Sequence, residues 1–377
     1  MLLGLLPLVD TSLLAVILAT RKTRWGWKRC FIRAVVLSGS YVVITTEALS
    51  CFKELNRPAL VGVWAVPLVL EISWLLYQAR SMPSIQWPKL SPRLNGFSLL
   101  GWGALGVVLL ITGISAWIWM PNTWDSLNYH LPRVAHWTQE HAVVHFATGI
   151  EVQNGIGPFA EYIILHTYIL SLSDRWANFV EWFAMAASII GVMLLVESFG
   201  GKRTAQFLSA ALLVSLPMGI AQATSTMTDY VVALFLLAVA IESVSLYLGN
   251  KDLWTIIILG LAAGMAICTK PTNMDTYGNP IGTTKLANVH TNELMTPRGW
   301  ISNIVRHASL HAGTPWESVN RVILRGIIKI HLLIDLSVDD PRTTSIGPYM
   351  FWKPRTEESF AGNSAHAYLY VFVLFFM

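Results

Sequence analysis

Charged side chains are scarce in this 377-residue sequence, where they make up only 13% of the residues. Soluble globular domains carry about 25% charged residues, so an ordinary water-soluble domain is excluded. Disorder is excluded as well, because 54% of the residues are hydrophobic and the mean hydropathy is +0.52. The class that remains is an integral membrane protein.

Cysteine is also rare, and some familiar motifs are missing. The three cysteines, Cys30, Cys51 and Cys268, have no metal-like spacing, so neither a disulfide framework nor a zinc site is predicted. A net charge of +4 is too small to indicate nucleic acid as a partner. No P-loop, His-Glu-x-x-His or Gly-x-Ser-x-Gly motif occurs, so nothing predicts nucleotide or peptide hydrolysis.

Long apolar runs are what the sequence does have. A bilayer core of about 30 Å needs roughly 20 apolar residues per helix. Eight runs are predicted to cross: Leu2–Thr20, Ala34–Cys51, Ala59–Ala79, Phe97–Met120, Trp176–Phe199, Ala205–Gln222, Tyr230–Leu248 and Leu253–Thr269. The run Ala365–Met377 is too short to cross and is interpreted as a truncated final span. The expected fold class is an all-α polytopic transmembrane bundle with external interfacial helices.

Basic residues predict the orientation, because Lys and Arg in short loops stay on the cytoplasmic side. Six of them lie in the segment 21–33, directly after the first span, so the N-terminus is expected outside. The run 158–172 is short and carries two ionisable side chains, so we interpret it as an amphipathic helix along the outer interface. With this topology Asp125, Asp229 and Lys270 all reach the outer face, although they are far apart in sequence.

Asp125 stands just beyond the fourth span and directly follows Trp124. A carboxylate flanked by aromatic rings at the headgroup level is placed to act on a molecule in the interface. Alternatively, Asp125 only caps the helix that follows it. Tyr129, His130 and Arg133 come four, five and eight residues later and partly share its helical face. Capping alone leaves these three residues without a role.

Asp229 and Lys270 stand at the ends of two other spans. Asp229 begins the seventh span, where it is either a helix cap in a favourable dipole or a second site carboxylate that holds a hydroxyl or a cation. Lys270 ends the eighth span, where it is either a snorkelling anchor or a cation for a phosphate headgroup.

Histidines and glycines give weaker signals. His141 and His145 share a helical face, but no neighbouring acidic cluster supplies further ligands, so they do not predict a metal site. Gly260 and Gly264 form a small-xxx-small pair, which predicts close helix packing.

The external segments resemble those of polytopic glycosyltransferases of the GT-C superfamily. The likeness is to bacterial members of the dolichyl-phosphate-mannose protein mannosyltransferase and lipid A aminoarabinose transferase group, and it covers residues 97–272. It is carried by Trp124-Asp125-Ser126-Leu127-Asn128-Tyr129-His130, the Gly157-Pro158 helix, Thr228-Asp229 and the segment 264–271.

The resemblance implies a polyprenyl-phosphate sugar as donor, with Asp125 as the catalytic residue and Asp229 as a second site carboxylate. The external face offers no nucleotide-sugar pool, and phosphate leaves readily, so one general base suffices for an inverting displacement. Lys270, together with Arg133, would stabilise the departing phosphate.

The other expected site residues bind substrate. Trp124 and Tyr129 would provide surface for the sugar, and His130 is assigned with them to substrate binding. No cofactor is expected. A divalent metal is possible but not supported. Many relatives carry a second acidic residue at the position after the catalytic carboxylate, where this sequence has Ser126.

Four segments are predicted. Residues 1–96 hold N-terminal transmembrane helices, and 97–270 form a catalytic core with the external loop 121–157. Residues 271–363 form an external polar segment with one amphipathic, interfacial helix over 319–336, and 364–377 hold the truncated last span. Relatives continue with further spans after the Lys-Pro element, so we expect a truncated or internally deleted member.

The functional hypothesis is a bacterial inner-membrane glycosyltransferase with its site on the periplasmic face. It would move a hexosyl or pentosyl group from a lipid-linked donor to an external glycan, lipid or protein. The alternatives are a membrane transporter or flippase, for which Asp10 is the acidic candidate at depth, and an inactive glycosyltransferase fragment.

Overall fold

The computed structural model describes residues 1–20, 26–81, 96–270 and 293–343, together with residues 349, 351 and 368. Every regular element within these ranges is a helix. The chain forms two compact units, one of residues 1–214 with 222–272 and the other of residues 215–221 with 273–377. The segments 1–96 and 97–270, separated in the sequence analysis, therefore belong largely to one compact unit.

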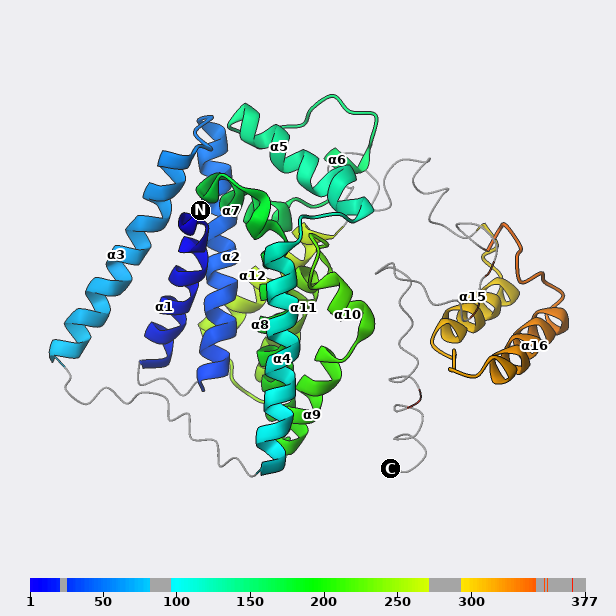
Figure 1. Ribbon diagram of the computed structural model, residues 1–377. Helices are drawn as coiled ribbons and strands as arrows, with labels where there is room; N and C mark the ends of the chain where they lie inside the picture. The colour runs from blue at the N-terminus through cyan, green and yellow to red at the C-terminus, as the bar shows by residue number, and fades with distance from the viewer. Residues whose placement is uncertain are drawn as a thin grey trace. The chain divides into compact units, whose positions relative to one another are not determined.

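Six helices in the described ranges are long and apolar enough to cross a membrane. They are α1 (Leu6–Thr20, preceded by a 3-10 turn over Leu2–Leu5), α2 (Trp27–Cys51), α3 (Arg57–Ser81), α4 (Gly96–Ile118), α8 (Ala177–Ser198) and α11 (Asp229–Tyr247). Figure 1 shows them standing side by side. The chain thus has the composition and the fold of a multi-pass membrane protein, as predicted.

The two remaining predicted spans differ from expectation. α12 (Leu253–Thr269) is helical and apolar but has only 17 residues. The predicted span Ala205–Gln222 is wrong as one helix, because it divides into α9 (Arg203–Val214) and α10 (Pro217–Gln222). Pro217 has no backbone N–H to donate and restricts the residue before it, so the helix stops ahead of the proline.

Short helices lie between α4 and α8. They are the π-helical turn η2 (Ser126–His130), α5 (Leu131–Glu140), α6 (Val152–Gly155), α7 (Phe159–Ser171) and the 3-10 turn η3 (Asp174–Trp176). Figure 1 shows α5, α6 and α7 gathered at the end of the bundle where α4 finishes. This cap of short helices carries Asp125 and its neighbours.

Helix α7 is not amphipathic, and the prediction of an amphipathic helix over residues 158–172 is wrong in that respect. All of its 13 residues except Ile163 and Tyr168 are buried, because five other helices, α2, α3, α5, α8 and α12, pack around it. Its ionisable side chains Glu161 and His166 therefore lie inside the protein, where each needs a partner.

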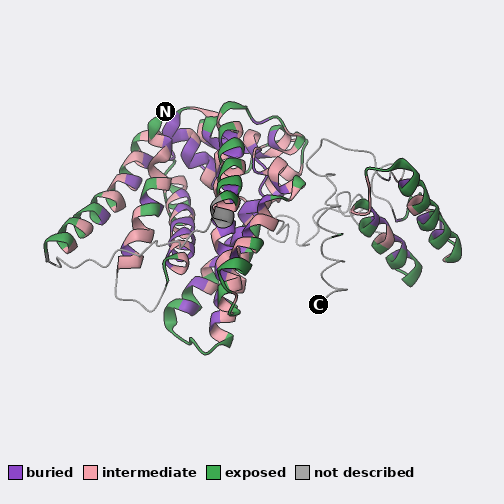
Figure 2. Cartoon of the chain, turned by 60° about the horizontal axis from the view of Figure 1, so that its bottom comes forward, coloured by how far each residue is buried: buried purple, intermediate pink, exposed green. Residues whose placement is uncertain are grey.

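Burial is uneven among the spans. Half of the apolar window of α8 and 44% of that of α11 are buried, against 11% for α3. Figure 2 shows the same contrast between the central helices and the outlying α3. The open faces of α3 carry Val66, Val69 and Leu70, which require lipid rather than water around them.

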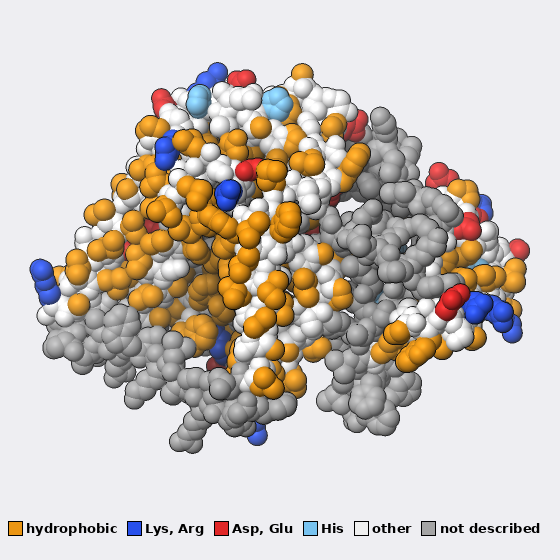
Figure 3. Space-filling model, viewed as in Figure 1, with side chains coloured by type: hydrophobic (Ala, Val, Ile, Leu, Met, Phe, Trp, Pro, Cys, Tyr) orange, Lys and Arg blue, Asp and Glu red, His pale blue; other side chains and the backbone are white. Residues whose placement is uncertain are grey.

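Hydrophobic side chains also cover the middle of the face in Figure 3, and charged ones gather toward the ends of the helices. A buried ion pair links three helices at the end opposite to the cap. Arg33 on α2 donates to both carboxylate oxygens of Glu242 on α11, at 2.9 and 2.6 Å, and to Thr255 on α12 at 2.8 Å. The bidentate geometry satisfies charges that would otherwise be costly to bury.

The second unit contains a helical hairpin of α15 (Pro297–Leu310) and α16 (Glu317–Leu333). The amphipathic helix predicted over 319–336 is present as α16. Helix α15 was not predicted, although Thr296 and Pro297 mark its start: the Thr296 hydroxyl accepts from the backbone N–H of Gly299 at 3.3 Å.

Candidate functional site

Asp125 is not the cap of the helix that it begins. The cap is Thr123, whose hydroxyl accepts from the backbone N–H of Ser126 at 3.2 Å, whereas the Asp125 side chain makes no capping bond. The alternative interpretation of Asp125 as a simple N-cap is therefore wrong. Its partly exposed carboxylate stands at a π-helical turn, an element often found at functional sites.

The Asp125 carboxylate accepts a hydrogen bond from Tyr129, one turn further on. The pKa of the Tyr129 phenol is raised well above its usual range, first by burial and then by the charge and the hydrogen bond of Asp125. The carboxylates of Glu161 and Asp229 add smaller contributions in the same direction. Tyr129 is thus a protonated donor surrounded by three carboxylates that come from separate parts of the chain.

Hydrogen bonds join the Asp125 turn to the start of α11. Thr226 donates to the Ser126 hydroxyl, and Thr123 lies 3.9 Å from the sulfur of Met227. Both contacts bridge about a hundred residues of sequence. They hold the Asp125 turn against the segment that leads into Asp229.

Asp229 and Lys270 form an ion pair, with Asp229 Oδ1 3.0 Å from Lys270 Nζ. The other oxygen of Asp229 accepts from Gln222 at 3.2 Å. Both partners keep about a third of their side-chain surface exposed, 35% and 38%. The site residues predicted at the ends of two different spans are therefore brought together and remain accessible.

Glu181 on α8 explains why Asp229 is free for this pair. The carboxylate of Glu181 accepts the backbone N–H of Tyr230 at 2.5 Å and that of Val231 at 3.3 Å. These two N–H groups lie in the first turn of α11, where no carbonyl of the same helix can accept from them. Because Glu181 accepts from them, the Asp229 carboxylate is not needed for that role. Sequence reasoning missed Glu181 because it lies inside an apolar span.

His130 and Arg133 converge on Glu161, a second residue that sequence reasoning did not assign to the site. His130 Nδ1 lies 2.8 Å and Arg133 Nη1 2.9 Å from the same oxygen of Glu161. Burial alone would raise the pKa of Glu161, but Arg133 and His130 outweigh it and hold the pKa below its ordinary value. The other Glu161 oxygen and His130 Nε2 are buried without a hydrogen-bond partner.

This placement changes the expected roles of His130 and Arg133. Both side chains are buried, and Arg133 also donates to the carbonyl of Ile156 at 2.9 Å. Through Glu161 they connect the helix that follows Asp125 to α7, inside the protein. Their predicted contact with substrate or phosphate therefore finds no support in this geometry. Trp124, by contrast, is 81% exposed and remains available to a sugar or to the interface.

Gly157 sets the approach of α12 to the cap. A Cβ atom at Gly157 would lie 2.3 Å from the carbonyl oxygen of Cys268, two residues before Lys270. Two of the motif segments thus touch through backbone. Close helix packing was predicted at Gly260 and Gly264, but the structure does not show it. No described atom lies within 4 Å of a Cβ built at either glycine.

Two other histidines, His136 and His166, have local partners. His136 stacks on Phe146, with ring centroids 3.9 Å apart, and within the described residues no group of three His, Cys, Asp or Glu side chains is arranged to hold a metal. His166 accepts from the indole N–H of Trp64 at 3.1 Å and donates to Thr46 at 2.9 Å. Burial lowers the pKa of His166 to about 3, so it is a neutral link between α2, α3 and α7.

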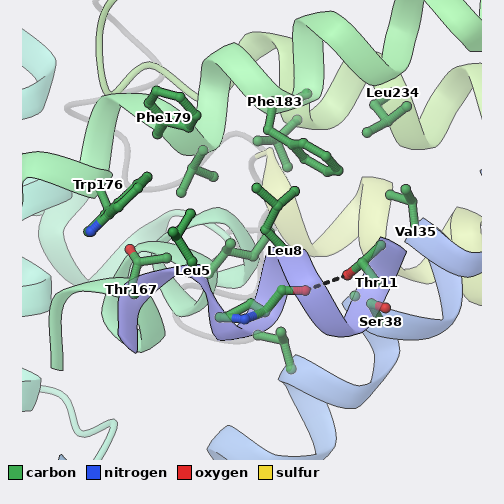
Figure 4. Close-up of a pocket in the computed structure, with 18 of the residues that line it drawn as sticks. Leu5, Leu8, Thr11, Val35, Ser38, Thr167, Trp176, Phe179, Phe183 and Leu234 are labelled. Atoms are coloured by element: carbon green, nitrogen blue, oxygen red, sulfur yellow. Dashed lines mark hydrogen bonds between the residues drawn. The ribbon is translucent and has the colours of Figure 1, made fainter. Parts of the chain in front are cut away.

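An apolar cavity of about 110 Å³ lies apart from these residues, between α1, α2 and α8. Figure 4 shows Leu5 of the 3-10 turn before α1 and Leu8 of α1 facing Phe179 and Phe183 of α8 across it. The Thr11 hydroxyl at its edge donates to the carbonyl of Pro7 at 2.7 Å. The cavity contains no charged side chain, so it offers hydrocarbon surface but no reactive group.

No protein-family model, curated protein or solved structure matches this chain. The function is therefore inferred from the chemistry of the residues themselves.

Proposed function

We propose that the protein is a membrane glycosyltransferase that moves a sugar from a polyprenyl-phosphate donor to an external glycan, lipid or protein. The observation that carries this proposal is the accessible Asp229–Lys270 ion pair at 3.0 Å, beside the hydrogen-bonded Asp125 and Tyr129. A carboxylate base and a cation for phosphate are the groups that such a transfer needs.

In the proposed reaction Asp125 takes the proton from the acceptor hydroxyl. The acceptor oxygen attacks the anomeric carbon as the bond from that carbon to the phosphate oxygen breaks, and the electron pair leaves with the phosphate. Lys270 stabilises the negative charge on the departing phosphate. An ammonium has three N–H donors, so Lys270 can bind a phosphate oxygen while it keeps Asp229.

Tyr129 and Glu161 would act by positioning. Tyr129 donates to Asp125 and so orients the base toward the acceptor. Glu161 fixes His130 and Arg133, which follow Asp125 on the same helix. Trp124 would offer its exposed ring to the sugar.

The distribution of cations supports a site on the external face. Lys28, Arg29 and Arg33 begin α2, and Lys202 and Arg203 lie at the start of α9, at the end opposite to α5 and α7 (Figure 1). Lys and Arg concentrate on the cytoplasmic side, so the Asp125 end would face the periplasm of a bacterial inner membrane.

The test is transfer of radiolabelled sugar from synthetic polyprenyl-phosphate hexoses and pentoses by the reconstituted full chain. Asp125→Asn should lower transfer about a hundredfold or more. Glu140→Gln is the matched control, because Glu140 is an exposed carboxylate at the end of α5. Unchanged transfer by Asp125→Asn would end the assignment of Asp125.

One observation favours the transporter alternative. Asp10 on α1 and Glu71 on α3 are buried within two spans, their charges interact, and each has an oxygen without a hydrogen-bond partner. Asp10 was predicted as the acidic candidate at depth, whereas Glu71 was not predicted. Buried carboxylates of this kind are typical of proton and cation pathways. Proton flux in proteoliposomes that is lost in Asp10→Asn and kept in Asp125→Asn would favour transport.

A further inference from the structure

The hairpin of α15 and α16 buries mostly polar and small side chains and exposes most of its large apolar ones. The buried residues of α15 are Gly299, Ser302, Arg306 and Ser309, and those of α16 are Asn320, Ile327 and His331. A water-soluble hairpin buries its apolar residues instead. Small and polar seams are typical of helices that pack against each other in lipid.

The buried polar groups of this seam are hydrogen-bonded. His331 Nδ1 donates to the carbonyl of Ile327 at 2.8 Å, which leaves Nε2 to accept from the Ser302 hydroxyl at 3.0 Å. Arg306 donates to the carbonyls of Val338 and Thr343. The inverted arrangement is therefore a satisfied interface.

One side of α16 carries an exposed apolar stripe of Val319, Val322, Ile330 and Leu333, with Gly326 between its two halves. These residues recur at helical spacing, and Val322 and Leu333 are 65% and 77% exposed. Trp316 at the start of the helix is also exposed, as is common for indoles at a bilayer surface.

The charges beside this stripe indicate what it contacts. Arg321, Arg325 and Lys329 follow each other at intervals of four residues and are all exposed, so they line one flank of the stripe. From residue 297 to residue 333 the hairpin has five cations and one carboxylate, Glu317. Apolar residues flanked by Lys and Arg suit a bilayer surface that carries negative headgroups.

We propose that α16 lies on the membrane surface, with this stripe inserted among lipid chains and its cationic flank bound to anionic phospholipid headgroups. Six described helices of the same chain are long and apolar enough to cross a bilayer, so the hairpin belongs to a chain that can be held at a lipid surface. The proposal does not depend on the proposed sugar transfer, and it goes beyond the interfacial helix expected from sequence by naming the contacting stripe and the lipid charge.

The test uses the full chain in vesicles with about 30% phosphatidylglycerol in phosphatidylcholine. An environment-sensitive fluorescent amino acid replaces Val322, Leu333 or, as matched control, Ile328. Ile328 is also exposed, but it lies six residues from Val322 and five from Leu333, on a different side of the helix. Spin-labelled lipid should quench the probe at positions 322 and 333 about twofold or more above position 328, and iodide in the water should quench in the reverse order.

The cationic flank is tested in the same experiment. Vesicles of phosphatidylcholine alone, or the triple variant Arg321→Gln/Arg325→Gln/Lys329→Gln, should reduce lipid quenching at position 322. Arg298→Gln is the control, because Arg298 is paired with Asp335. Equal lipid quenching at positions 328 and 322, or equal quenching at 322 with and without phosphatidylglycerol, would overturn the proposal. Protection of position 322 from both quenchers would overturn it in favour of contact with a second copy of the chain.

Discussion

Asp229 Oδ1 lies 3.0 Å from Lys270 Nζ, although two helices, α11 and α12, separate the two residues in sequence. Both side chains are about one third exposed. Exposed ion pairs contribute at most about 1 kcal/mol to stability, so this pair is poorly suited to hold the fold together. Its position at an accessible helix end, beside Asp125, is the arrangement expected of a binding site.

Removal of the cation tests that interpretation. Lys270→Gln should lower sugar transfer about tenfold to a hundredfold, because the departing phosphate loses its stabilising charge, while the thermal midpoint changes little. Transfer and thermal unfolding in detergent are measured on the same preparation. The control is Lys53→Gln, an exposed lysine just after α2. A large drop in thermal midpoint with Lys270→Gln would instead assign the pair to the fold.

Glu161→Gln should destabilise the protein strongly. The substitution leaves the Arg133 guanidinium buried without a counter-charge, which costs about 3–5 kcal/mol. The double variant Arg133→Gln/Glu161→Gln removes both charges and should recover part of that loss. Denaturant unfolding of the single and double variants measures the difference, and equal destabilisation by both would contradict an ionic role for Glu161.

The pH dependence of stability should follow His166. Its pKa is about 3 in the folded protein, against 6.5 as the ordinary value, so between these pH values the unfolded chain binds a proton that the folded chain excludes. Stability from this group is complete above pH 6.5 and falls with acidification, by up to about 1.4 kcal/mol per pH unit. His166→Gln should flatten that part of the profile. An unchanged slope in the variant would show that other groups cause it.

Glu161 adds a separate acid-dependent contribution. Its pKa is lowered in the folded protein, so the stabilisation is present above the ordinary carboxyl pKa and is lost as the pH falls through the lower folded value. The loss should therefore begin at more acidic pH than that of His166. Comparing unfolding profiles of Glu161→Gln and the parent chain separates the two contributions.

Gly157→Ala should damage both fold and function. The new methyl group would meet the carbonyl oxygen of Cys268 at 2.3 Å, so α12 must shift and carry Lys270 with it. The matched control is Gly264→Ala on α12, the helix that carries Cys268, where a Cβ has open space. This substitution should be neutral or stabilise the protein by up to about 1 kcal/mol. Normal transfer and stability in Gly157→Ala would show that this approach can relax without consequence.

Most of the long helices could be predicted from the length and periodicity of the apolar runs. The predictions that were wrong or incomplete each have a physical reason. The predicted span over 205–222 missed the effect of Pro217, a local signal present in the sequence. Helix α7 was expected to be amphipathic, yet five other helices pack around it, and no property of residues 159–171 reveals that. Glu181 and Glu71 were overlooked because single acids within apolar runs do not alter the prediction of a span.

The sequence by itself determined that this chain forms apolar helices of membrane length, because a backbone in lipid must satisfy its own hydrogen bonds. It also determined which polar residues stand at the helix ends. Only the tertiary structure decided that Asp229 meets Lys270, that Glu161 gathers His130 and Arg133, and that the α15–α16 hairpin is polar inside. Those pairings depend on how helices rotate and approach each other, and that is set by side-chain packing between segments far apart in the chain.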